Sequence, residues 1–213
     1  MSTHLYAFGS ICRGEIDASS DIDLLACLSA PKAGINPDRF SIYTHTRLRE
    51  LWQQGNPFAW HLHLESRILF SSDGEDFVGE LGRPNNYTHT ASDCEKFRLL
   101  FSDSLTALRE SSNSRTFNLS CMFLATRNFA TCFALGEGKP TFSRYSPFEL
   151  DSKFPISRED FEIFARARIL STRGYGPNLT DQDIERAMSS SPSIVLWMKR
   201  LALEYLSMGY CSD

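Results

Sequence analysis

The pattern of apolar and polar positions divides the chain into a first part of short elements and a second part of long helices. Short apolar or alternating runs predict strands at 5–8, 24–28 and 40–43. A helix is expected over 47–54, where apolar residues recur at helical spacing, and a polar turn is expected over 71–76. The first part is therefore predicted to mix strands and helices.

The run 58–70 between these elements is compatible with two structures. As a strand, its middle would place His61, His63 and Glu65 on one face, because alternate strand residues point the same way. As a helix, it would make Glu65 the i+4 neighbour of His61. The pattern leaves both alternatives open.

From about residue 91 onward the periodicity is that of helices. Apolar residues recur at helical spacing over 97–108, 161–169 and 194–206. The stretch 117–135 is apolar nearly all round, which is typical of a central, buried helix, and residues 180–183 predict the start of a short further one. The sequence therefore predicts an α+β protein with two domains, 1–90 and 91–213, the second a helical bundle.

The residues with the clearest chemistry lie between the first two predicted strands. Gly9-Ser10 follows the first strand directly, then Arg13-Gly14, and Ser20-Asp21-Ile22-Asp23 precedes the second. Carboxylates at i and i+2 of a strand share a face and repel each other unless a divalent cation lies between them. Mg²⁺ prefers carboxylate, phosphate and water oxygens, while glycine permits close approach of the backbone to a phosphate. This pattern predicts a site for Mg²⁺ and phosphate.

This string resembles the motif of the nucleotidyltransferase superfamily that includes DNA polymerase β, and especially its small bacterial branch, the minimal nucleotidyltransferases. That branch carries Gly-Ser, Arg-Gly and Ser-Asp-x-Asp at nearly this spacing. The motif covers residues 5–28; beyond it, a small catalytic domain followed by helices resembles the aminoglycoside nucleotidyltransferases in architecture only. The resemblance implies a small mixed-sheet nucleotidyltransferase core in 1–90 and a substrate- or partner-binding bundle in 91–213.

The resemblance also implies roles for particular residues. Asp21 and Asp23 would be catalytic and would hold Mg²⁺ in a two-ion site, with Mn²⁺ as an alternative ion. The residues expected to bind the nucleotide are Gly9, Ser10, Arg13, Ser20, Lys139 and Arg144. Four of these residues have an alternative role. Arg13 could face solvent and cap the turn, and Ser20 could be a turn cap. The loop that holds Lys139 and Arg144 could be an ordinary connection between helices.

A third carboxylate usually lies on a neighbouring strand in this superfamily, where it helps to activate the nucleophile. The corresponding predicted strand, 40–43, contains no acidic residue. Glu65 and Asp38 are the candidates to replace it, and the absence of any third acid is the remaining alternative. Of these, Glu65 is the residue predicted to be the third catalytic group.

Composition and charge narrow the class of partner. The net charge of −4 and pI of about 5.8 disfavour a long nucleic acid as substrate, because no global basic field attracts it. The six cysteines show no Cys-x-x-Cys pair and are expected to be reduced. Without a signal-peptide pattern or about 20 consecutive apolar residues, a cytoplasmic protein with no membrane segment is expected.

The resemblance thus implies an Mg²⁺-dependent nucleotidyltransferase that moves a nucleoside monophosphate from an NTP to a hydroxyl group. The acceptor, a protein, a small molecule or an RNA end, stays open, as does a homodimer or a protein partner. The alternative function is a binding or regulatory module, such as an antitoxin-like partner, that keeps the fold but lacks part of the two-metal site.

Overall fold

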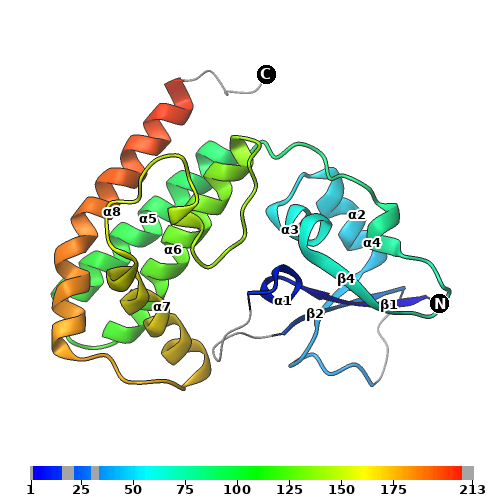
Figure 1. Cartoon of the computed structure of the whole chain (residues 1–213), viewed down its shortest axis with the longest axis horizontal. Helices are drawn as coiled ribbons and strands as arrows, with labels where there is room; N and C mark the ends of the chain where they lie inside the picture. The colour runs from blue at the N-terminus through cyan, green and yellow to red at the C-terminus, as the bar shows by residue number, and fades with distance from the viewer. Residues whose placement is uncertain (1, 16–21, 30–33, 208–213) are drawn as a thin grey trace. The chain divides into compact units, whose positions relative to one another are not determined.

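The computed structural model describes residues 2–15, 22–29 and 34–207 (Figure 1). These residues form an α+β structure in which helices predominate. The chain divides into two compact units, Met1–Thr88 and His89–Asp213. Within the described residues, the sheet belongs to the first unit and the second is helical.

The first unit is built on a four-stranded mixed sheet with the order β3-β2-β1-β4. Its strands are β1 (Thr3–Phe8), β2 (Asp23–Leu28), β3 (Ser41–Thr44) and β4 (Ser66–Ser71). β1 pairs antiparallel with both β2 and β4, and β2 pairs parallel with β3. The strands expected at 5–8, 24–28 and 40–43 are confirmed to within two residues at each end.

Three helices cover one face of this sheet (Figure 1). They are α2 (His45–Gln53), α3 (Pro57–Glu65) and α4 (Phe77–Glu80), while the short α1 (Ser10–Arg13) follows β1. Tyr6 and Phe8 of β1 alternate toward this face, and the apolar positions of α2 and α3 pack against them in one buried cluster. The period-two pattern of the strands and the helical pattern of 47–54 thus meet in the same core.

The segment 57–65 is helical, so the strand alternative for its middle is wrong. Asn56 caps α3 by accepting a hydrogen bond from the Phe58 amide, and Pro57 occupies the first helical position, where its missing N–H costs nothing. Leu62 is fully buried against the sheet. His61, His63 and Glu65 therefore do not share a strand face; only His61 and Glu65 are neighbours.

The second unit contains four long helices. They are α5 (Thr90–Glu110), α6 (Arg115–Gly136), α7 (Arg158–Arg173) and α8 (Asp181–Ser207), with the short η1 (Ser146–Phe148) before α7. α6 is the buried helix expected at 117–135, and its packing partners include α5 and α7. Across the described residues, no helix has both the length and the apolar character needed to cross a membrane.

One expectation for the second unit is wrong. The short helix predicted to start at 180–183 is not separate from the last predicted helix, at 194–206. Both belong to α8, which continues through Pro192. Proline removes one backbone hydrogen bond inside a helix. Buried residues on both sides of it, Ala187 and Ile194 among them, keep one apolar face in the core, and this packing outweighs the local penalty.

We predict that two glycines of the first unit differ sharply in their tolerance of alanine. Gly55 and Gly82 have similar positive φ angles of 60° and 63°, but a Cβ on Gly55 would lie 2.3 Å from the Asn86 carbonyl oxygen, whereas nothing lies within 4 Å of one on Gly82. Gly82→Ala should cost about 1–2 kcal/mol of unfolding free energy from backbone strain. Gly55→Ala should cost about 1–3 kcal/mol more from the collision.

Urea titration of both variants followed by far-UV circular dichroism measures this difference. Equal destabilisation would contradict the packing of Gly55 against the backbone at residues 85–86.

Candidate functional site

The candidate site begins where β1 ends, at Gly9. This residue has φ 77° and ψ −142°, a backbone conformation that is accessible to glycine but strained for residues with a side chain. Its amide donates to the Glu65 carbonyl at 3.0 Å, and its own carbonyl accepts from the Cys12 amide at 2.9 Å. The chain therefore turns sharply away from the sheet at the position of the Gly-Ser motif.

Asp23 lies directly beside this turn. The antiparallel register pairs Phe8 with Asp23, which places the first residue of β2 next to the end of β1. A Cβ on Gly9 would lie 2.8 Å from Asp23 Oδ2 and 3.7 Å from His61 Nε2. The space that a side chain would fill is thus taken up by a carboxylate and an imidazole, and Gly9 is required for both its conformation and its contacts.

Glu65, at the end of α3, links this turn to two basic groups. Its carboxylate pairs with the Arg13 guanidinium, and its Oε2 lies 3.0 Å from His61 Nε2, one helical turn earlier. Arg13 also donates to Glu15 at 2.9 Å. The side chains of Arg13, His61 and Glu65 are all less than a fifth exposed, so these pairs lie in a largely desolvated environment.

The electrostatics of this group favour an ionised Glu65. Burial alone would raise the pKa of its carboxyl, but the hydrogen bond and charge of His61, together with Arg13, outweigh burial and leave the pKa lowered. Burial raises the pKa of the neighbouring Cys12 thiol. Cys12 is therefore protonated at neutral pH and is a poor nucleophile.

The structure describes only part of the predicted set of residues. Gly9, Asp23, Glu65 and Arg13 lie together around the turn, and Ser10, half-buried, opens α1. Ser20 and Asp21 lie outside the described residues. Among the residues described, no group of three or more His, Cys, Asp or Glu side chains could hold a metal ion, so the ligand set centred on Asp21 and Asp23 stays a prediction.

Other candidates lie away from the turn. Asp38 is exposed in a turn before β3, where its amide donates to the Asn36 side chain. Lys139 and Arg144 belong to the second unit, and Lys139 forms an exposed ion pair with Asp151. Tyr145 beside them donates its hydroxyl hydrogen to Glu162, and Arg158 lies 4.0 Å from its ring centroid.

Sequence reasoning did not anticipate that Arg13 and Glu65 would pair. They are 52 residues apart, and their meeting depends on how α3 packs beside the end of β1. The contact between His61 and Glu65 can be predicted from the sequence. Asn56-Pro57 is a recognisable helix start, and a helix makes these two residues i,i+4 neighbours.

We predict that Glu65 stabilises the fold in a pH-dependent way. Because its pKa in the folded protein is below the unfolded value of about 4.3, its contribution is present above that pH and is lost as pH falls through the lowered pKa. Glu65→Gln should therefore cost about 1–3 kcal/mol of unfolding free energy at pH 7 and progressively less at acidic pH.

Urea unfolding of both proteins between pH 3 and 7 measures this difference, with Glu50→Gln as control because Glu50 forms only an exposed pair with Arg47. A difference between the native and Glu65→Gln proteins that stays constant across the range would contradict the ion-pair role.

Neither a protein-family model nor a curated protein matches the chain.

Proposed function

We propose that the first unit catalyses Mg²⁺-dependent transfer of a nucleoside monophosphate from an NTP to a hydroxyl acceptor. The observation that carries this proposal is the close approach of the Asp23 carboxylate to the Gly9 backbone at the end of β1. Such an arrangement brings an acidic oxygen and a side-chain-free turn to one point, as a metal-bound triphosphate requires. The resemblance of residues 5–28 to the nucleotidyltransferase motif supports the same activity.

The donor set fits magnesium in its chemistry. Asp23 is exposed at the strand end and offers hard carboxylate oxygens, and Asp21 would be its partner in holding the ion. Bound Mg²⁺ would neutralise phosphate charge, and Mn²⁺ could replace it. Gly9 and Ser10 would contact the phosphates.

The transfer itself needs an acceptor oxygen to attack the α-phosphorus. The new O–P bond forms as the bond to the β-phosphate oxygen breaks, pyrophosphate leaves, and the acceptor proton passes to a base. Glu65, with its lowered pKa, is a weak base, so we assign it the positioning of Arg13 and His61. In its neutral form, His61 would be the group beside the turn able to accept the proton.

One observation favours a second candidate function. The Glu65 carboxylate is already engaged by Arg13 and His61, and β3 supplies no acidic side chain. A protein that keeps the nucleotidyltransferase fold without a third metal-binding carboxylate would act as a binding or regulatory module. Nucleotide binding without transfer to any acceptor distinguishes this module from the enzyme.

We predict that Asp23→Asn removes the Mg²⁺-dependent part of NTP binding while leaving the fold intact, since the change is nearly isosteric. Calorimetric titration of ATP, GTP, CTP and UTP with and without Mg²⁺ tests this, with Asp103→Asn on the exposed face of α5 as control. Retained Mg²⁺-dependent binding in Asp23→Asn would remove the metal assignment.

Ser10→Ala should weaken NTP binding about tenfold through loss of one hydrogen bond to a charged group.

Gly9→Ala gives a sharper test of the close approach at the turn. Its methyl group would lie 2.8 Å from Asp23 Oδ2 and must displace that carboxylate, whereas Gly14, with nearly the same φ of 76°, has nothing within 4 Å of an added Cβ. We expect Gly9→Ala to abolish Mg²⁺-dependent NTP binding and Gly14→Ala to retain it. Equal affinities in the two folded variants would show that the Gly9–Asp23 contact is not part of the nucleotide site.

A further inference from the structure

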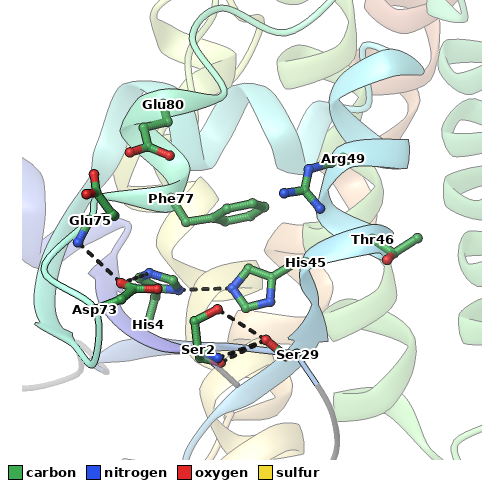
Figure 2. A pocket seen from close by; sticks show the side chains of 10 residues that line it. All are labelled: Ser2, His4, Ser29, His45, Thr46, Arg49, Asp73, Glu75, Phe77 and Glu80. Carbon is green, nitrogen blue, oxygen red and sulfur yellow. Dashed lines mark hydrogen bonds and ion pairs between the residues drawn. The ribbon is translucent and has the colours of Figure 1, made fainter.

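A separate pocket of about 410 Å³ lies at the opposite end of β1 (Figure 2). Its volume is within the range of sites for small molecules. Its lining comes from the starts of β1 and α2, the end of β2, and the segment 73–80 with α4. His4, which lines it, is five residues before Gly9, or about 16 Å along an extended strand, so the pocket is distinct from the candidate nucleotide site.

The floor of the pocket is rigid and buried. His4, His45 and Phe77 are each less than a tenth exposed. The ring of His45 meets Phe77 edge-on at 4.5 Å, and His4 stacks on Phe77 at 5.9 Å. Tyr6 holds the start of α4 in place, because its hydroxyl donates to Asp76 and accepts from the Val78 amide. The floor of the pocket is therefore preorganised.

The two histidines belong to a continuous chain of polar contacts. His4 Nδ1 lies 3.0 Å from His45 Nε2, and His4 Nε2 lies 3.0 Å from Asp73 Oδ1. Asp73 also accepts hydrogen bonds from the Ser71 hydroxyl and the Glu75 amide. Together with the hydrogen bond to His4, these contacts lower the pKa of Asp73 to about 2. Both ring nitrogens of His4 and the Asp73 carboxylate are thus occupied, and this chain shapes the floor instead of binding a ligand.

Two carboxylates, those of Glu75 and Glu80, line one side of the pocket. Glu75 and Glu80 lie on the same side of Phe77 in Figure 2, and within the described residues neither forms an ion pair. Both carboxyl groups line the same side of the pocket, and the neighbouring Glu75 raises the pKa of Glu80. An ammonium group placed between them would relieve the repulsion between the two charged carboxylates.

Among the described lining residues, one guanidinium group, that of Arg49, faces the pocket from the other side. Arg49 of α2 lies 4.9 Å above the Phe77 ring, on the side away from Glu75 and Glu80 (Figure 2). In the part of the chain that the structure describes, no carboxylate pairs with it. A planar guanidinium held over an aromatic ring is suited to bidentate binding of a carboxylate.

We propose that this pocket binds a small zwitterion of the amino-acid class, with its ammonium group between Glu75 and Glu80 and its carboxylate on Arg49. The rest of the ligand would span the pocket between these two ends. The separation of unlike charges across one buried ring carries this assignment: a simple cation would leave Arg49 without a partner, and a simple anion would meet two carboxylates. The proposal is independent of the nucleotidyltransferase activity, since no lining residue belongs to the Gly9 turn.

The test compares charge-matched ligands on the full chain. Saturation-transfer NMR at millimolar ligand measures binding of the twenty standard amino acids and 4-aminobutyrate, with butylamine and butyrate as probes that each carry one charge. We expect at least one zwitterion to bind, and both butylamine and butyrate to bind at least about tenfold more weakly, because each loses one charge-assisted contact.

Two variants assign the ends of the ligand. Arg49→Gln should weaken the zwitterion about tenfold or more without affecting butylamine, and Glu75→Gln/Glu80→Gln should do so without affecting butyrate. Arg109→Gln, at an exposed arginine of α5, is the matched control. The altered side chains are exposed, so unfolding midpoints without ligand should match the control.

Two results would overturn the proposal. One is the absence of binding by every zwitterion at millimolar concentration. The other is butylamine binding as tightly as the best zwitterion together with no effect of Arg49→Gln, which would make the pocket a site for cations alone.

Discussion

The hydrogen bonding of β1 to strands on both of its edges is the constraint on which the first unit depends. β2 and β4 hold β1 between them, so its alternate residues His4, Tyr6 and Phe8 are directed to the face covered by helices. Tyr6 and Phe8 are part of the apolar core, and His4 extends the same row to the pocket. One strand therefore places the core and both candidate sites.

The two ends of β1 have different chemistry because different elements meet there. At the Gly9 end, the antiparallel register brings in Asp23, and α3 contributes His61 and Glu65. At the His4 end, the start of α2 contributes His45, and the turn after β4 contributes Asp73. At the Gly9 end, Arg13, Glu65 and His61 pair with one another within the protein. At the His4 end, Arg49, Glu75 and Glu80 form no ion pair among the described residues, and we assign a ligand to them.

The Arg13–Glu65 pair is an ion pair in a largely desolvated place. Removing either partner would leave the other charged in a largely desolvated place, which is costly. The same pair holds Arg13 beside the turn that we assign to phosphate. A role for Glu65 in positioning thus accounts for its burial and for its pairing with both Arg13 and His61.

Local patterns in the sequence determined the strands at 5–8, 24–28 and 40–43 and the buried helix at 117–135. They also determined the glycine turn at the end of the first strand. These features follow from residue periodicity and from glycine's freedom at positive φ, which act over a few residues. Where two local patterns competed, in 58–70, the Asn56 cap and the burial of Leu62 selected the helix.

The tertiary structure alone decided which side chains far apart in the sequence meet. Arg13 reaches Glu65 across 52 residues, and His4 reaches His45 and Asp73 across 41 and 69 residues. Such contacts are set by sheet register and by the packing of α2 and α3, which no short stretch of sequence encodes. The sequence by itself therefore determined the chemical groups available to this protein, and the packing around β1 decided which of them act together, because ion pairs and hydrogen bonds need contact within a few ångströms.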